Sequence, residues 1–251
     1  MPNHPPLAIL GASCRLPGGA RDLDSLWDLL ASGRDAITEI PADRFDVEAL
    51  YDPDPDAPGR TWSRWMGALD HLWDFDPSFF GLSPREATAM DPQQRMLLEV
   101  AWEALEAAGI PPGALRGSRT GVFVGTNTND FPLVRNRDPS TIDAFTAAGM
   151  HTAVLANRIA HALDLRGPNL SLDTACAAGL TAIHLAAASV RSGECELALA
   201  GGVNLCLHEI GFMGTTKARM LSPTGRPRVF DHRADGYVRG EGCGLVAIAS
   251  L

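Results

Sequence analysis

The chain has 251 residues, of which 45% are hydrophobic and 20% charged, so it can bury the core of one large domain or of two small ones. Its formal net charge of −9 at pH 7 argues against a surface that binds nucleic acid, and no apolar run reaches the length that spans a membrane. Five scattered cysteines without a Cys-x-x-Cys pair, and a start without the features of a secretory leader, favour free thiols in the cytoplasm and argue against a metal site.

The first part of the chain predicts one strand, one capped helix and a loop. Residues 7–11 read as a buried strand, and residues 22–33 as a helix that Asp22 or Asp24 caps. Pro, Asp and Gly crowd residues 51–62, which is typical of a loop. The helix is expected to carry an apolar stripe formed by Leu26, Trp27, Leu29 and Leu30.

Two capping residues, Ser83 and Asp91, each stand directly before a proline. A side-chain oxygen followed by proline at the first helical position is a strong signal for the start of a helix. We therefore predict one short helix after Ser83 and a longer one after Asp91. The longer helix is expected to end near Ala108, because Gly109 and Pro111 follow it.

The second half of the chain alternates between strand-like and helix-like segments. Strands are predicted over 120–126, 168–175, 197–205 and 242–251. Helices are predicted over 144–163, with a break near Gly149, and over 176–191, ended by Gly193. This alternation favours a layered α/β fold, and the chain shows no internal repeat or linker, so we expect a single domain.

Residues 171–180, "SLDTACAAGL", place a lone cysteine between a predicted strand and a predicted helix. In the first turn of a helix, Cys176 would meet unpaired backbone N–H groups and the positive end of the helix dipole, which favour the thiolate. Asp173 and Thr174 are expected to set a sharp turn that presents the sulfur outward. The small residues 177–179 would let a substrate approach. The alternative interpretation is a small, buried, unreactive side chain.

Several long segments resemble one family. Residues 172–205, "LDTACAAGLTAIHLAAASVRSGECELALAGGVNL", resemble the active-site segment of β-ketoacyl synthases, with two alanines and a glycine where the family usually has serines. Residues 7–37, 79–110 ("FFGLSPREATAMDPQQRMLLEVAWEALEAAGI") and 221–244 resemble the ketosynthase domains of modular type I polyketide synthases. The resemblance covers nearly the whole chain.

The resemblance implies a thiolase-like layered α-β-α fold. Residues 1–251 would form a single, apparently truncated domain, the amino-terminal half of that fold with the start of the second half missing. It also implies an acyltransferase in which Cys176 accepts an acyl chain, and its backbone N–H helps to bind the oxyanion. The reaction would be a decarboxylative Claisen condensation with a malonyl-type extender, in polyketide biosynthesis.

The resemblance further implies that no cofactor is bound directly, because an acyl carrier protein delivers the substrate on its phosphopantetheine arm. Other polyketide synthase domains would be partners, and residues 168–174 would pair across the twofold axis of a homodimer. Phe230, in "FDHRADGYVRGEG", would line the acyl pocket. No binding of nucleic acid, membrane or metal is implied.

The two histidine motifs that the family uses for decarboxylation are not found in this sequence. His184 follows Cys176 by eight residues on the same predicted helix, about 12 Å along the axis, which is beyond direct proton transfer. We expect it on the apolar face, in the core or at a contact between protomers. The alternative function is therefore a catalytically incomplete fragment or split-enzyme half that only accepts acyl groups or binds partners.

Overall fold

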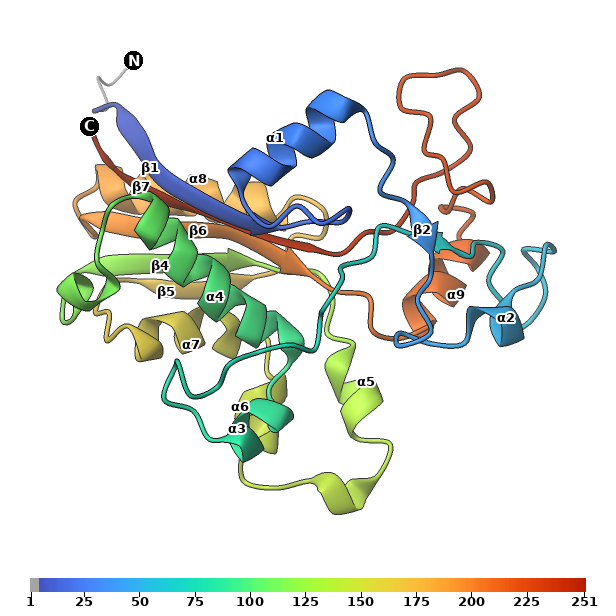
Figure 1. Ribbon diagram of the computed structural model, residues 1–251, viewed down its shortest axis with the longest axis horizontal. Helices are drawn as coiled ribbons and strands as arrows, with labels where there is room; N and C mark the ends of the chain where they lie inside the picture. Colours follow the sequence, from blue (N-terminus) through green and yellow to red (C-terminus); the bar gives the residue numbers. More distant parts are fainter. Residues whose placement is uncertain (1–4) are drawn as a thin grey trace.

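The computed structural model describes residues 5–251 and shows a twisted sheet flanked by helices (Figure 1). The strands, in chain order, are β1 (Leu7–Arg15), β2 (Thr38–Glu39), β3 (Trp65–Met66), β4 (Thr120–Gly125), β5 (Asn169–Leu172), β6 (Leu197–Asn204) and β7 (Gly242–Ser250). The main sheet has five strands in the order β1-β7-β6-β4-β5, and β2 pairs with β3 separately. Strand β4 runs parallel to β5 and β6, whereas β7 runs antiparallel to β6 and β1.

The helices connect these strands or cover the sheet. They are α1 (Leu23–Ser32), α2 (Val47–Leu50), α3 (Pro84–Ala89), α4 (Pro92–Ala107), α5 (Phe131–Arg135), α6 (Thr146–Met150), α7 (Val154–Ala162), α8 (Ala178–Arg191) and α9 (Ile210–Lys217), with 3-10 turns at Pro112–Leu115 and Pro139–Thr141. Within residues 5–251, none of the helices combines the length and the hydropathy that crossing a membrane requires.

The predicted helix caps are confirmed. The Asp22 carboxylate accepts a hydrogen bond from the Ser25 N–H at 2.7 Å and begins α1, so Asp22 rather than Asp24 is the cap. The Ser83 hydroxyl accepts from the Glu86 N–H at 3.1 Å and begins α3. Each cap gives an acceptor to an N–H group that the first helical turn leaves without one.

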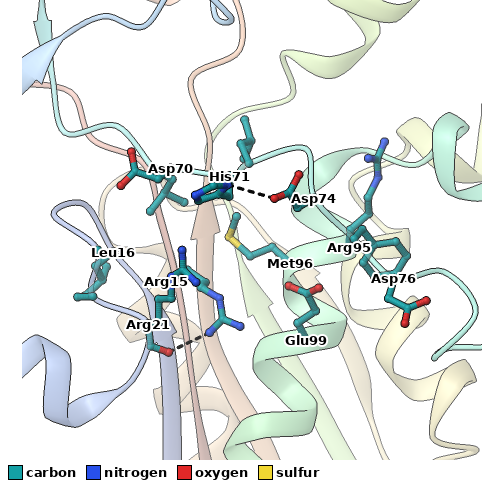
Figure 2. A pocket seen from close by; sticks show the side chains of 15 residues that line it. Arg15, Leu16, Arg21, Asp70, His71, Asp74, Asp76, Arg95, Met96 and Glu99 are labelled. Carbon is teal, nitrogen blue, oxygen red and sulfur yellow. Dashed lines mark hydrogen bonds and ion pairs between the residues drawn. The ribbon is translucent and has the colours of Figure 1, made fainter.

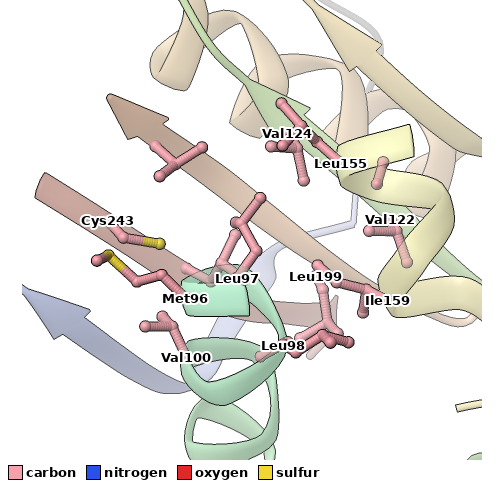
Figure 3. Packing of buried hydrophobic residues seen from close by; sticks show 14 of the residues in the cluster. Met96, Leu97, Leu98, Val100, Val122, Val124, Leu155, Ile159, Leu199 and Cys243 are labelled. Atoms are coloured by element: carbon pink, nitrogen blue, oxygen red, sulfur yellow. The ribbon is translucent and has the colours of Figure 1, made fainter. Parts of the chain in front are cut away.

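The core lies on both faces of the main sheet because side chains alternate along its strands. Val122 and Val124 of β4 pack with α4 and α7 in the larger buried cluster (Figure 3). Phe123, between them, packs with α8 in a second buried cluster. The layers are therefore α4 and α7, then the sheet, then α8, which confirms the predicted layered α/β fold.

The break predicted near Gly149 in the helix over 144–163 is confirmed, because α6 ends at Met150 and α7 begins at Val154. Other features of the elements differ from what the sequence suggested. The predicted apolar stripe of α1 is not covered: no residue of this helix is buried, and Trp27 and Leu30 are 69% and 65% exposed. His184 is exposed rather than in the core. The short helices α2, α5 and α9 were not predicted, since their sequences carry no strong apolar period.

Candidate active site around Cys176

A strained turn joins β5 to α8 and carries Cys176. The Asp173 carboxylate accepts a hydrogen bond from the Ala175 N–H at 2.7 Å, as expected, whereas the Thr174 hydroxyl lies 3.1 Å from the Thr181 hydroxyl. Ala175 has a φ of 53°, the left-handed conformation that costs a residue with a Cβ about 1 kcal/mol or more. The turn reverses the chain directly before the thiol.

Helix α8 begins at Ala178, so Cys176 lies just before the first helical turn and not inside it, which corrects the predicted helix over 176–191. Cys176 and Ala177 belong to the turn that begins at Ala175 and not to the helix. Within residues 5–251, no group accepts a hydrogen bond from the Cys176 N–H. That N–H is therefore free to bind an oxygen atom of a ligand near the sulfur.

Accessibility separates Cys176 from the other cysteines. Cys176 is exposed, so the alternative interpretation as a small buried side chain is wrong. The other four thiols are free but buried, at Cys14, Cys195, Cys206 and Cys243. Burial raises the pKa of the Cys14, Cys206 and Cys243 thiols, because the thiolate is poorly solvated there. Nucleophilic chemistry by a thiolate is thus favoured at one position.

Cys176 lines a cavity of about 370 Å³ at the carboxyl ends of the parallel strands. Its walls come from the carboxyl ends of two strands and the start of a third. They are formed by residues 125–127 at and after the end of β4, 202–204 at the end of β6, 239–242 before and at the start of β7, and Ala175, Ala178, Gly179 and Tyr237. Open α/β sheets commonly bind ligands at this edge, because the loops that follow the strands diverge there.

Glycines bring the cavity walls close together. A Cβ on Gly125 would lie 2.3 Å from the Ala178 carbonyl carbon, so α8 can begin against β4 only when residue 125 has no side chain. A Cβ on Gly201 would lie 2.0 Å from the Gly244 oxygen, across the β6–β7 pair. The two glycines of "GGVN" (201–204) therefore serve close backbone packing.

Neither Phe230 nor any histidine of the described residues lines this cavity. Phe230 is fully exposed, with a φ of 60°, whereas Tyr237 from the same segment lines the cavity and is 40% exposed. Within residues 5–251, no histidine is among the lining residues, and His4 lies outside the described residues. An imidazole base for Cys176 is not supplied by this part of the chain.

The polar wall of the cavity was missed by sequence reasoning. Thr126 and Asn127 directly follow the apolar strand β4, and Asn204 ends β6. Polar residues that directly follow buried parallel strands are the signal that could have identified them. Asn204 has a structural contact here, because its Nδ2 donates a hydrogen bond to the Gly240 oxygen at 2.8 Å.

A second, larger cavity of about 560 Å³ lies elsewhere and shares no lining residue with the first (Figure 2). Charged side chains of both signs surround it, among them Arg15, Arg95 and Glu99. Its one short contact between lining side chains joins His71 Nδ1 to an Asp74 oxygen at 3.1 Å. None of its lining residues is a cysteine.

Comparison with known proteins gives consistent relatives. A phenolphthiocerol/phthiocerol polyketide synthase of Mycobacterium tuberculosis is 50% identical over 246 residues, which are 98% of this chain and 14% of that protein. Polyketide synthase GfsB of Streptomyces halstedii is 49% identical over 247 residues, which are 98% of this chain and 4% of that protein. The chain therefore spans only a small part of these long relatives.

Solved structures agree with this. The oxazolomycin ketosynthase domain OzmH KS7 of Streptomyces albus superposes with a TM-score of 0.90 at 41% identity, over 97% of this chain and 42% of that chain. The ketosynthase from module 6 of the bacillaene synthase of Bacillus subtilis 168 gives a TM-score of 0.87 at 38% identity, over 98% of this chain and 40% of that chain. The thiolase-like fold predicted from the resemblance is confirmed.

The family described as "Beta-ketoacyl synthase, N-terminal domain" matches residues 4–251. With the relatives and the superposed structures, this match confirms the resemblance noted in the sequence. The chain belongs to the β-ketoacyl synthase family and is the amino-terminal part of a ketosynthase domain of the modular type I polyketide synthase kind.

Proposed function

We propose that this chain supplies the acyl-accepting half of a ketosynthase active site, with Cys176 as the nucleophile. One observation carries the proposal: of the five cysteines, only Cys176 is exposed, and it opens onto the cavity at the carboxyl ends of β4, β5 and β6. The complete reaction would be a decarboxylative Claisen condensation that extends a polyketide chain.

In the first step, the Cys176 thiolate attacks the carbonyl carbon of an acyl thioester on the phosphopantetheine arm of an acyl carrier protein. The new S–C bond forms, and the bond between the acyl carbon and the carrier sulfur breaks. The carrier leaves as a thiolate and takes up the proton that the Cys176 thiol lost when it ionised. In the second step, a malonyl-type thioester loses CO₂, and its carbanion attacks the Cys176 thioester. The S–C bond at Cys176 then breaks, and the cysteine is free again.

The backbone supports this chemistry at the attacked carbonyl. Negative charge develops on the carbonyl oxygen when the thiolate adds, and a fixed N–H donor stabilises it. The Cys176 N–H has no hydrogen-bond acceptor within residues 5–251, and Cys176 lines the cavity, so we assign this N–H the role. The same reasoning extends to partners: acyl carrier protein and other polyketide synthase domains would deliver and receive the chain.

Phe230 stays a proposal for acyl binding. Its ring is fully exposed, and it belongs to the segment whose later residues, Tyr237 and Arg239, line the cavity. An apolar ring exposed to this extent is available to contact an acyl chain or a neighbouring segment of a longer protein.

Acylation can be tested directly. Incubation with an acyl thioester of N-acetylcysteamine should add one acyl group to the protein, because one accessible thiol is present, and intact-mass spectrometry would show it. Cys176→Ala should lose the addition, whereas Cys206→Ala, which removes a buried thiol, should keep it. Acyl label on any other cysteine of the wild-type protein would contradict the proposal.

Among the described residues, no histidine lines the cavity. For residues 1–251 alone, this favours the alternative function, an acyl-accepting unit without condensing activity. Proton transfer and charge stabilisation during decarboxylation need such groups. We expect the acylated chain to release little CO₂ from a malonyl thioester, measured with ¹⁴C-carboxyl label. Release at a rate comparable to that of a ketosynthase containing both histidine motifs would contradict this prediction.

A further inference from the structure

A buried ion pair lies behind the Cys176 cavity. The side chains of Arg44 and Glu241 are 1% and 0% exposed. Arg44 donates from Nε to one Glu241 oxygen and from Nη2 to the other, each at 2.8 Å. This two-pronged geometry fixes the orientation of both groups as well as their separation.

The Glu241 carboxylate also binds two backbone N–H groups. It accepts from the Leu69 N–H at 2.9 Å and from the Cys206 N–H at 3.2 Å. Arg44 Nη2 additionally donates to the Leu69 oxygen at 3.0 Å. One carboxylate therefore joins four segments that are far apart in the sequence.

Glu241 belongs to the wall of the cavity that holds Cys176. Gly240 and Gly242 flank it, and all three residues line the cavity. The glycines offer no side chain that could anchor the wall, so its position depends on hydrogen bonds. The Glu241 N–H donates to the Gly67 oxygen at 2.8 Å, and the Gly67 N–H donates to the Arg239 oxygen at 2.9 Å. Asn204 and the ion pair also anchor the wall.

Stability alone does not explain a buried pair at this place. Replacing such a pair with apolar side chains of similar size is often neutral or stabilising, because burying two charges costs about as much as their attraction returns. An apolar pair could not, however, accept the Leu69 and Cys206 N–H groups. What the ion pair adds over an apolar pair is this set of hydrogen bonds, which fixes the position of Glu241 within the wall.

We propose that Arg44 and Glu241 are positioning residues that hold the wall 239–242 where an acyl thioester fits against Cys176. The inference rests on the proposed function of Cys176. Neither charged group reaches the substrate; both act through the backbone of the wall. Displacement of the wall should therefore slow a reaction that fills the cavity and spare one that needs only access to the sulfur.

The test compares two reagents on the same protein. The rate of Cys176 acylation by a long-chain acyl thioester reports on the cavity, and the rate of alkylation by iodoacetamide reports on access to the thiol alone. We expect Glu241→Gln and Arg44→Lys to slow acylation about tenfold, since small misplacements have effects of this size or larger. The rate of alkylation should change less than about twofold.

Two further variants separate position from stability. The double variant Arg44→Met with Glu241→Gln leaves no unpaired buried charge, so it remains testable if a single variant fails to fold. Ile159→Val, in the cluster between the sheet and α7, is a destabilised control that should leave the ratio of the two rates unchanged.

The outcomes distinguish the two proposals. A ratio of acylation to alkylation that falls in the ion-pair variants, and not in Ile159→Val, supports the positioning role. An unchanged ratio in folded ion-pair variants, with normal acylation of the wild type, overturns this inference alone. Failure of the wild type to acylate at Cys176 overturns the proposed function as well.

Discussion

At the scale of single residues, Asp91 shows how strongly burial changes a carboxyl group. It is 3% exposed, and it caps α4 by accepting a hydrogen bond from the Gln93 N–H at 2.8 Å. Burial raises the pKa of Asp91 to about 6, and the hydrogen bonds from Gln93 lower it only in part. Ionisation of this capping carboxyl group is therefore less favourable in the folded protein than in the unfolded chain.

The direction of the resulting pH dependence follows from proton binding. Between about pH 4 and pH 6 the folded protein keeps the Asp91 proton that the unfolded chain has lost, so raising the pH through this window lowers the free energy of unfolding. Between pH 5 and pH 7.5, the free energy of unfolding of Asp91→Asn should therefore increase by about 1 kcal/mol relative to that of the wild type. Urea unfolding of both proteins at the two pH values measures this, and a difference that does not change with pH would contradict it.

Asp22 provides the opposite control. Its exposed carboxylate accepts hydrogen bonds from the Ser25 hydroxyl and N–H, which lower its pKa. The stability that Asp22 gives is present above the pKa of the unfolded chain and is lost as the pH falls through the folded value. The free energy of unfolding of Asp22→Asn should therefore not increase relative to that of the wild type as the pH rises.

At the scale of elements, the packing of α8 on β4 depends on one missing side chain. The Cβ of an alanine at position 125 would lie within 2.6 Å of three backbone atoms of Ala178 and Gly179. Gly125→Ala should push back the start of α8, destabilise the protein by about 1–3 kcal/mol and slow acylation of Cys176. Thermal unfolding and the mass assay would measure both effects.

Gly214, in the interior of α9, is the matched control. A Cβ there would meet no atom within 4 Å. Gly214→Ala should be neutral or stabilising by up to about 1 kcal/mol, because alanine favours the helix. Equal destabilisation by both substitutions would mean that the close approach at Gly125 has no special importance.

Local signals in the sequence predicted where helices begin, but not what packs against them. Asp22, Ser83 and Asp91 marked helix starts correctly because a cap involves only residues within one turn. The start of α8 was placed too early, since the left-handed conformation of Ala175 depends on the turn as a whole and not on alanine itself. Exposure of α1 could not be predicted, because an apolar stripe does not show what covers it.

At the scale of the whole molecule, β5 forms an edge of the main sheet with only β4 beside it. The Pro168 and Leu172 oxygens accept hydrogen bonds from N–H groups of the β4 side. Because backbone groups alternate in direction along a strand, those of Asn169 and Ser171 point away from β4. Unpaired groups on an edge strand can pair with a second chain. This supports the prediction that residues 168–174 form a homodimer contact.

Asn169→Pro tests this contact. Proline removes an outward N–H and leaves the pairing with β4 intact, so the variant should fold normally and self-associate at least about tenfold more weakly, as judged by sedimentation over a range of concentrations. Asn169→Ala, which keeps the N–H, should associate like the wild type. Equal association of the proline variant would contradict pairing through β5.

The candidate site was only partly predictable from sequence. Cys176 could be identified because the motif around it is contiguous. The remaining walls, at 125–127, 202–204 and 239–242, are brought to it by the order of the strands, which no local pattern encodes. The Arg44–Glu241 pair joins residues 197 positions apart, so only the folded chain shows it.

The contrast between one open thiol and four enclosed ones has a practical consequence. A maleimide dye or a trifluoromethyl tag should attach at a single defined position without any cysteine having to be removed first. Because that position lies in the cavity, the fluorescence or the ¹⁹F resonance of such a conjugate would report directly on whatever approaches the sulfur.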